Sequence, residues 1–387
     1  MNEAVIVAAG RTPIGRAFKG SLIDARPDDM AAFVIRTLMA RLQTLDPREV
    51  DDVVIGAVAG SAEQGYNLGR AAALLAGLPD SVAGTTVNRM CASSLQAIRI
   101  AHHAIKMGEA QVVVAGGVES ISRTASASFK LADANPRFVD EMREDFVNHY
   151  YVSMGLTAEN VADRYGITRG DMDAFAKKSQ DRAVATQASG SFDQEIVPYP
   201  LADGTFLTRD DGPRPGTTLE ALAQLKPAFR PDGRVTAGNA CPLNDGAAAV
   251  VVMSEVRARE LGIKPLARIV GSAVSGVAPE MMGIGPIDAV KKVLGQAGMS
   301  IRDIGVVELN EAFAAQVLPV CRELDIDIED QLNPHGGAIA LGHPYGMTGA
   351  RIMTALLNDL SELDRRFGLE AMCVGGGQGM AMIVERL

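Results

Sequence analysis

Asp46-Pro-Arg-Glu-Val-Asp-Asp-Val-Val-Ile-Gly56 is the stretch that decides the fold, because its pattern returns in the second half of the chain. A helical stretch from Asp28 to Leu42 precedes it. In the same way, Ile287–Ala297 precedes Ser300-Ile-Arg-Asp-Ile-Gly-Val-Val-Glu-Leu-Asn310. Each copy is typical of a helix, a short polar turn and an apolar, β-branched strand.

A second pair of strands repeats at a similar distance. Val112-Val-Val-Ala-Gly-Gly117 and Ala371-Met-Cys-Val-Gly-Gly376 both end in glycines, and Gly117 and Gly376 lie 259 residues apart. The strands of the first pair begin near Val53 and Val306, 253 residues apart. Two matches at nearly one offset predict a duplicated α/β unit.

The segment between the two copies has a different texture. Residues 121–242 hold polar helical stretches, Thr157–Tyr165 and Arg169–Ser189, and turn-rich stretches between them. We therefore predict three domains: a first core domain of residues 1–120 and 243–265, an inserted domain of residues 121–242, and a second core domain of residues 266–387. Alternating strands and helices predict sheets covered by helices, with ligands near strand ends.

Bulk composition excludes several classes of protein. The 387 residues are 47% hydrophobic and 22% charged, with a formal net charge of −10, which argues against a nucleic-acid partner. No apolar run approaches the roughly 20 residues that span a bilayer. The N-terminus lacks the pattern of an export signal, so we expect a cytoplasmic protein with reduced thiols. Its four cysteines are too far apart for a zinc ribbon, and we predict no metal site.

Cys91 is the first candidate for chemistry. It lies in Thr86-Val-Asn-Arg-Met-Cys-Ala-Ser-Ser-Leu-Gln96, just before an apolar stretch from Leu95 to Met107 that predicts a buried helix. Unpaired N–H groups and the positive end of the helix dipole would favour a thiolate there and could hold an oxyanion. The alternative is an inert buried cysteine.

Three further residues have both a catalytic and a structural interpretation. His343 lies in a glycine-rich loop before a helix, 252 residues after Cys91, so the repeat would bring the two together; otherwise it is a structural loop histidine. Cys373 precedes Gly375-Gly-Gly-Gln-Gly379 on the last glycine-ended strand, where glycines free backbone N–H groups to face a substrate; the alternative is a core cysteine beside a turn. Asn310 could present a side-chain donor at a strand end, or cap the following helix.

These segments together resemble the signatures of the thiolases. The matching runs are Val87-Asn-Arg-Met-Cys-Ala-Ser-Ser94, Asn310-Glu-Ala-Phe313, Gly336-Gly-Ala-Ile-Ala-Leu-Gly-His-Pro-Tyr-Gly346 and Cys373-Val-Gly-Gly-Gly-Gln-Gly379. The likeness extends from Val5 to the C-terminus. It implies an α/β thiolase fold, in which two pseudo-symmetric domains form a layered α-β-α-β-α core that carries an inserted loop domain.

The resemblance also implies a role for each residue. Cys91 would take the acyl group as a thioester, His343 would remove its proton, and Cys373 would exchange a proton with the α-carbon. One oxyanion hole would come from His343 and a water held by Asn310, the other from the N–H groups of Cys91 and Gly375.

The substrates implied are coenzyme A and acyl-CoA, with no tightly bound cofactor. Arg214, in the inserted segment, would meet the adenosine phosphate end of coenzyme A, and Cys241, Met154 and Phe313 would line the rest of the site. Cys241 and Thr348 stand where the family usually has serine. The resemblance further implies a homodimer or homotetramer, and a β-oxidation multienzyme partner is an open expectation.

The run Val152-Ser-Met-Gly155 looks more like degradative thiolases than biosynthetic ones. It favours thiolysis of 3-ketoacyl-CoA in fatty-acid β-oxidation over the alternative, acetyl-CoA C-acetyltransferase. A decarboxylating ketoacyl synthase fits less well, because it is expected to use a second histidine. A non-catalytic acyl-CoA-binding or lipid-binding protein would have no reason to keep Cys91, Cys373 and His343.

Overall fold

The computed structural model describes residues 2–127 and 129–387. Its strands are β1 (Ala4–Arg11), β2 (Gly15–Arg16), β3 (Asp52–Gly56), β4 (Ala83–Val87), β5 (Val112–Ser120), β6 (Tyr199–Pro200), β7 (Phe206–Leu207), β8 (Asn244–Ser254), β9 (Ala267–Gly276), β10 (Val306–Leu309), β11 (Phe367–Val374) and β12 (Gln378–Arg386). Its α-helices are α1 (Pro27–Arg41), α2 (Leu68–Leu75), α3 (Ser93–Met107), α4 (Ile121–Thr124), α5 (Met154–Tyr165), α6 (Arg169–Ser189), α7 (Leu219–Ala223), α8 (Glu255–Glu260), α9 (Gly285–Ala297), α10 (Ala314–Leu324), α11 (Ala338–Leu341) and α12 (Thr348–Glu362).

The predicted duplication is confirmed by the order of the strands. In the first half β3 lies parallel to β5, and β5 lies antiparallel to β8; in the second half β10 lies parallel to β11, and β11 lies antiparallel to β12. Strand β4 has only a trace of a counterpart, a single parallel bridge between Val307 and Leu332. The helices α3 and α12 occupy equivalent places before β5 and β11.

The two half-sheets join into one sheet, which the sequence did not predict. The order is β10-β11-β12-β9-β1-β8-β5-β3-β4, with β2 paired to β8. The join is a short antiparallel contact between β1 and β9, in which Val5 faces Arg268 and Ile6 faces Ala267. The duplicated units therefore share backbone hydrogen bonds as well as side-chain packing.

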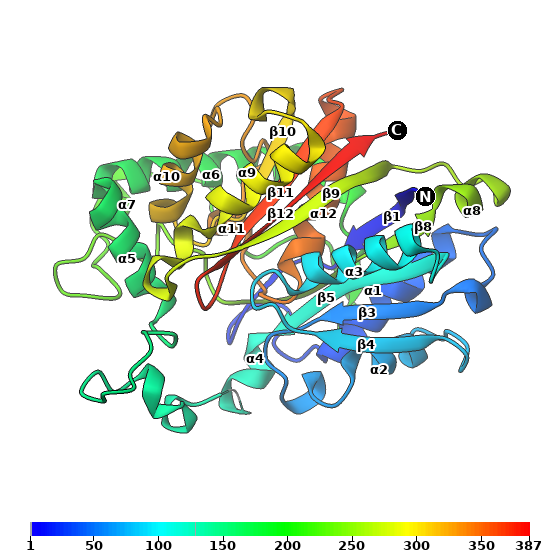
Figure 1. Cartoon of the computed structure of the whole chain (residues 1–387), viewed down its shortest axis with the longest axis horizontal. Coiled ribbons are helices and arrows are strands. Elements are labelled where there is room, and N and C mark those ends of the chain that lie inside the picture. The colour runs from blue at the N-terminus through cyan, green and yellow to red at the C-terminus, as the bar shows by residue number, and fades with distance from the viewer. Residues whose placement is uncertain (1, 128) are drawn as a thin grey trace.

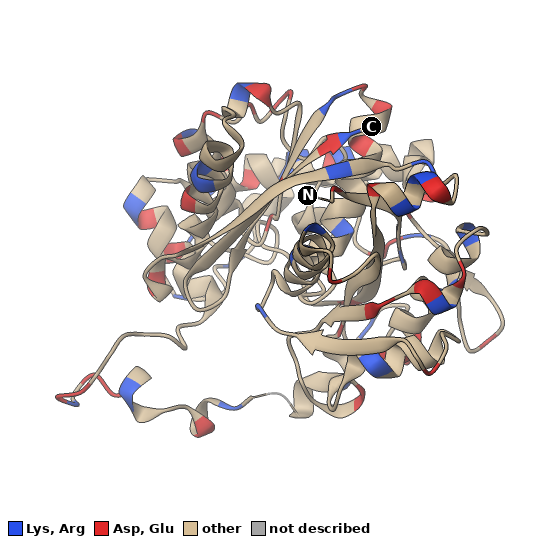
Figure 2. Ribbon diagram, turned by 45° about the vertical axis from the view of Figure 1, so that its right-hand side comes forward, with Lys and Arg blue, Asp and Glu red and all other residues tan. Residues whose placement is uncertain are grey.

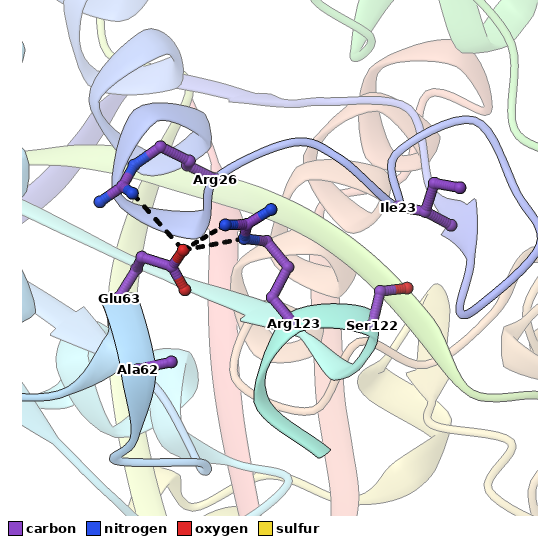
Figure 3. Close-up of a pocket in the computed structure, with 6 residues that line it drawn as sticks. All are labelled: Ile23, Arg26, Ala62, Glu63, Ser122 and Arg123. Atoms are coloured by element: carbon purple, nitrogen blue, oxygen red, sulfur yellow. Dashed lines mark hydrogen bonds and ion pairs between the residues drawn. The ribbon is translucent and has the colours of Figure 1, made fainter. Parts of the chain in front are cut away.

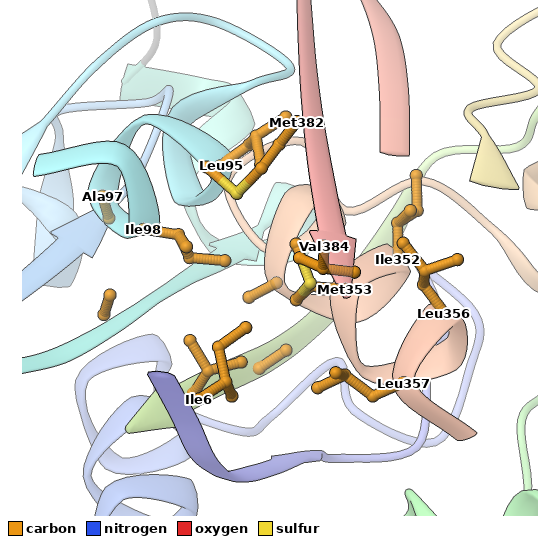
Figure 4. Close-up of a cluster of buried hydrophobic side chains, with 14 of the residues drawn as sticks. Ile6, Leu95, Ala97, Ile98, Ile352, Met353, Leu356, Leu357, Met382 and Val384 are labelled. Atoms are coloured by element: carbon orange, nitrogen blue, oxygen red, sulfur yellow. The ribbon is translucent and has the colours of Figure 1, made fainter. Parts of the chain in front are cut away.

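Three apolar clusters separate the layers of the molecule. The central cluster joins α3 and α12 to the inner faces of both half-sheets, and Figure 4 shows Leu95 and Ile98 of α3 near Ile352 and Met353 of α12. The second cluster packs α9 and α10 against the far side of the second half-sheet, and the third packs α1 and α2 against the first. This is the expected α-β-α-β-α layering (Figure 1).

The strands and helices follow from simple local signals. Every residue of β5 and β8 is buried, which explains their unbroken apolar runs. Helix α1 begins with Pro27 and carries Asp28 and Asp29 in its first turn, where acidic side chains favour the helix dipole. Charged residues lie mostly on the outer helices and loops (Figure 2).

The inserted segment occupies a position that the second half fills with a tight turn. Strands β11 and β12 are joined by Gly375, Gly376 and Gly377, the last two with positive φ. The equivalent strands β5 and β8 are separated by residues 121–243. This segment first extends away from the body as an arm between α4 and α5 (Figure 1), and then packs α5 and α6 against α10 and α11. Within the described residues, no helix is long and apolar enough to cross a membrane.

We predict that the close contact between α3 and α12 tolerates no added methyl group. A Cβ built on Gly349 would lie 2.4 Å from the Leu95 backbone nitrogen, whereas one on Gly295 of α9 meets nothing within 4 Å. Gly349→Ala should therefore lower the free energy of unfolding by about 1–3 kcal/mol. The control Gly295→Ala should raise it by about 0.5–1 kcal/mol. Urea unfolding checks both, and equal midpoints for the two variants would contradict the packing argument.

Candidate active site

Cys91 sits at a strained turn immediately before α3. Met90 has φ +45°, a conformation that side chains other than glycine adopt rarely, and the Asn88 side chain accepts a 2.8 Å hydrogen bond from the Met90 N–H. Helix α3 begins at Ser93, whose hydroxyl donates to the Met90 carbonyl at 2.6 Å. The turn presents Cys91 at the helix N-terminus, with its side chain half-buried.

The electrostatics of Cys91 leave it protonated until a base acts. Burial raises the pKa of the Cys91 thiol to about 11, and the Glu119 carboxylate adds to the rise. Hydrogen bonds from the backbone N–H groups of Gly375 and of Cys91 itself lower that pKa in part. Two N–H groups thus converge on the sulfur, one from each half of the molecule.

A side-chain bridge holds the two halves in this register. Arg89 donates from Nε to Gln96 at 2.8 Å and from Nη1 to Gln378 Oε1 at 3.1 Å. The Gln378 amide in turn donates to the Gly375 carbonyl at 3.3 Å. The segment before Cys91 is therefore tied to the glycine turn that supplies the second N–H.

His343 is buried in the loop before α12, and its hydrogen bonds fix its tautomer. The Thr348 hydroxyl donates to the Pro344 carbonyl at 2.7 Å, so its oxygen accepts from His343 Nδ1 at 2.6 Å. Nδ1 therefore carries the proton and Nε2 the lone pair. Burial, reinforced by the Arg351 guanidinium, lowers the pKa of His343 to about 3, so the imidazole is neutral at neutral pH.

Asn310 faces His343 and does not cap a helix. Its Nδ2 lies 3.4 Å from His343 Nε2, and its Oδ1 is buried without a protein partner in the described chain. Helix α10 has Phe313 at its N-cap, so the capping alternative for Asn310 is wrong. A buried amide with an unused oxygen suits the fixing of a water or a polar substrate atom.

Three thiols gather at this site. Cys373 is fully buried on β11, and its pKa is raised well above the usual value by burial, and also by repulsion from Cys91 and Cys241. Burial and the neighbouring Cys91 raise the pKa of Cys241 in the same way. His343 borders this group through Tyr345, whose ring lies 5.1 Å from the imidazole and whose pKa is raised by burial and by Cys241 and Cys91.

Two buried carboxylates that the sequence analysis did not single out anchor the loops of the site. Glu119, at the end of β5, accepts from the N–H groups of Val58, Ala59 and Gly346. Glu311, next to Asn310, accepts from Ser179, Asn333 and the N–H of Ile339. The one sequence signal for Glu311 was its place in the motif Asn310-Glu-Ala-Phe313. No pattern in the sequence pointed to Glu119.

A pocket of about 190 Å³ opens beside these groups and is lined by the inserted segment. Its walls are Gln180, Arg214, Thr217, Ala221, Leu222, Leu225, Ala237, Gly238, Pro242 and Ile339. Pro242 directly follows Cys241, so the pocket adjoins the thiols. No acidic side chain in the described part of the chain pairs with the Arg214 guanidinium, which leaves it available to an anion.

Met154 and Phe313 lie on the side of the site nearest the glycine turn. The Met154 sulfur would lie 3.9 Å from a Cβ built on Gly375. Phe313 forms a bridge with Ala240 and an edge contact with Phe229, their ring centroids 6.1 Å apart. The structure thus links Cys91 to Gly375, Cys373 and Cys241, and Asn310 to His343, whereas Arg214 lines the separate pocket wall.

A larger depression, about 730 Å³, lies elsewhere, between Ile23, Arg26, Ala62, Glu63, Ser122 and Arg123 (Figure 3). Within this depression the Glu63 carboxylate forms ion pairs with both Arg26 and Arg123. The Ser122 hydroxyl in its wall donates to Asp245 Oδ2 at 2.5 Å and accepts from the Phe18 N–H at 2.8 Å. In the described residues, no group of three or more His, Cys, Asp or Glu side chains could hold a metal ion.

The arrangement suits covalent catalysis on a carbonyl compound. It combines a protonated thiol with two N–H donors, a neutral imidazole whose Nε2 lone pair faces the Asn310 amide and can accept a proton, and a second buried thiol. The adjoining pocket, with an arginine at its wall, would hold a long anionic substrate.

Comparison with known proteins gives consistent matches over the whole chain. A model described as thiolase, N-terminal domain matches residues 4–256, and one described as thiolase, C-terminal domain matches residues 263–386. The chain is 47% identical to a 3-oxoadipyl-CoA/3-oxo-5,6-dehydrosuberyl-CoA thiolase of Escherichia coli (strain K12) and 43% identical to a 3-ketoacyl-CoA thiolase of Bacillus subtilis (strain 168), with 100% of each chain covered. The crystal structure of the Bacillus anthracis acetyl-CoA acetyltransferase superposes with a TM-score of 0.90 at 42% identity, covering 100% of this chain and 99% of that one.

The Thr348 hydroxyl offers a direct test of the imidazole geometry. Thr348→Val removes the acceptor for His343 Nδ1, so the ring loses its fixed tautomer and Cys91 loses its proton less readily. We expect the rate at which iodoacetamide alkylates Cys91 at neutral pH to fall on the order of tenfold. This is less than the roughly 10²–10⁴-fold rate enhancement that a positioned general base typically contributes, because the base is displaced and not removed. Thr348→Ser keeps the hydroxyl and should keep the parent rate. An unchanged rate in Thr348→Val would show that the hydroxyl does not orient the base.

Proposed function

The chain belongs to the thiolase family and transfers acyl groups carried by coenzyme A, and on that premise we propose that it cleaves 3-ketoacyl-CoA with coenzyme A to give a shortened acyl-CoA and acetyl-CoA. The observation that carries the proposal is the convergence of Cys91, His343, Cys373 and Asn310, which come from both halves of the chain, on one site beside a pocket.

In the first step His343 Nε2 accepts the Cys91 proton, and the sulfur attacks the 3-keto carbon. The N–H groups of Cys91 and Gly375, which lie beside the sulfur, would stabilise the tetrahedral oxyanion. The bond between C2 and C3 then breaks, leaving the acyl group on Cys91 and the electron pair on the thioester enolate. A thioester α-carbanion is costly, so donors fixed in advance at its oxygen, His343 and a water held by Asn310, would lower the barrier.

Cys373 completes the first half of the reaction by protonating the enolate carbon, which releases acetyl-CoA. Its high pKa keeps it protonated at neutral pH, as an acid in this role requires. A second coenzyme A then attacks the acyl group while its thiol proton passes to the Cys373 thiolate. Cys91 leaves as the shortened acyl-CoA forms and recovers its proton from His343. The reverse sequence is the condensation that the acetyltransferase alternative would catalyse.

Apolar side chains favour an uncharged acyl chain. Met90 and Met154 flank Gly375, and the Tyr150 ring lies against Gly376. None of these carries a charge that would pair with a terminal carboxylate, which supports straight-chain 3-ketoacyl-CoA and a place in fatty-acid β-oxidation. The name of the E. coli relative favours a second candidate substrate, 3-oxoadipyl-CoA.

We further propose that the protein works as a homo-oligomer in the cytoplasm. Strand β4 lies at the edge of the ten-stranded sheet with partly exposed residues. Such an edge offers unpaired backbone groups to a second strand, which supports dimer formation through this edge.

Acetyl transfer separates the roles of the two cysteines. Mixing with radiolabelled acetyl-CoA should leave label on Cys91, and Cys91→Ser should abolish it because the hydroxyl is a far poorer nucleophile beside this base. Cys373→Ser should keep the labelling largely intact but block hydrogen exchange at the acetyl-CoA α-carbon. Peptide mass spectrometry and deuterium exchange are the measurements. Wild-type labelling of Cys91→Ser would overturn the assignment of the nucleophile.

A substrate panel tests the direction and the acyl preference. We expect thiolysis of straight-chain 3-ketoacyl-CoA of several lengths, with a higher kcat/KM than for 3-oxoadipyl-CoA. Release of acetyl-CoA, followed by chromatography, gives the rates. Turnover confined to acetoacetyl-CoA would replace the degradative assignment by the acetyltransferase, and a preference for 3-oxoadipyl-CoA would establish the second candidate.

A further inference from the structure

Arg351 is a buried cation on the helix that supports His343. It lies in the first turn of α12, three residues after Thr348, and its side chain is 2% exposed. Its Nη1 lies 3.7 Å from Oε2 of Glu308, a buried residue of β10, and its Nε and Nη1 have no hydrogen-bond partner in the described structure. The reaction steps above do not use this arginine, although a buried guanidinium is costly to keep.

The contact between Arg351 and Glu308 closes a ring around the base. Glu308 and Asn310 are alternate residues at the end of β10, and Asn310 lies 3.4 Å from His343 Nε2. His343 Nδ1 lies 2.6 Å from Thr348, and Thr348 and Arg351 are neighbours on one face of α12. The Arg351 contact thus adds a charged link between β10 and α12 to their apolar packing and to the link through the imidazole.

We propose that Arg351 is a positioning residue for the His343 imidazole, and that its contact with Glu308 fixes the start of α12 against β10 so that Nε2 is held between Asn310 and Cys91. The proposal rests on the proposed role of His343 as the base for Cys91.

The charges around Arg351 support a second effect on the same imidazole. Four buried carboxylates interact electrostatically with the guanidinium: Glu308 on β10, Glu311 just after β10, Glu370 on β11 and Glu195 in the inserted segment. Glu308 also interacts with Asp359, which is hydrogen-bonded to His335. Burial raises the pKa of Glu308 and of Glu370, and the guanidinium opposes both shifts. Arg351 is also the charged group that, after burial, lowers the pKa of His343. The Tyr345 ring lies against the imidazole as well.

Arg351→Met should separate positioning from binding. Because the base is displaced while the coenzyme A pocket is untouched, we expect kcat for thiolysis to fall roughly tenfold to 100-fold with little change in KM for coenzyme A. Arg351→Lys should recover part of the loss. Arg257→Met is the control: Arg257 pairs with Glu49 and Glu260 and lies outside the ring and the charges around Arg351, so the variant should keep the parent kcat.

A measurement without substrate keeps this test independent of the reaction. In ¹⁵N-histidine-labelled protein, His343 should keep the Nδ1–H tautomer over pH 5–8, and in Arg351→Met it should protonate at higher pH because a nearby cation is gone. His343→Asn assigns the resonance. If the protein did not catalyse thiolysis, the nitrogen shifts would still show whether Arg351 affects the tautomer and protonation of His343.

Glu308→Leu provides a second route if Arg351→Met does not fold. It removes the contact while the guanidinium stays, so kcat should fall but His343 should not protonate at higher pH. The proposal would be overturned if Glu308→Leu folds and keeps both the parent kcat and the parent His343 nitrogen shifts. Arg351→Met with the parent kcat and the parent nitrogen shifts would overturn it as well.

Discussion

The close approach of α3 and α12 is the constraint on which the rest of the structure depends. Gly349 lets the two helices touch at Leu95, and the Ala350 N–H donates to the Ser94 hydroxyl at 2.9 Å. Because Cys91 lies just before α3 and His343 lies in the loop before α12, this contact determines where the thiol and the imidazole meet. A duplicated unit with wider helix spacing would keep both residues and lose their juxtaposition.

Burial then sets the protonation states that the chemistry needs. The same low-polarity surroundings raise the pKa values of Cys91 and Cys373 and lower that of His343, so all three groups rest uncharged. In the mechanism we propose, proton transfer from Cys91 to His343 creates two charges at once, and the N–H groups of Cys91 and Gly375 would offset part of that cost. In that mechanism the sulfur loses its charge when it bonds to the carbonyl carbon, because the negative charge passes to the carbonyl oxygen.

The sequence predicted the repeat, because each copy left a local pattern of a helix, a turn and a glycine-ended strand. The domain boundaries and the site residues rest on texture and motifs, and they stay predictions. The sequence did not predict the β1–β9 join, which is a two-residue contact without any periodicity. Nor did it predict the supports of the site. Glu119 binds N–H groups 60 residues earlier and 227 residues later in the chain, and such contacts arise only once the layers have packed.

The two halves differ most where their last two strands connect, and that difference produces the site. In the second half, Gly375, Gly376 and Gly377 make a turn so tight that backbone N–H is brought to Cys91, and the positive φ of Gly376 and Gly377 explains why glycine is needed there. In the first half the same connection is opened by residues 121–243, which supply most of the lining of the pocket of about 190 Å³. One copy of the hairpin thus supplies a donor to the thiol and the other a wall for the substrate, so duplication followed by a single insertion accounts for an asymmetric active site between symmetric layers.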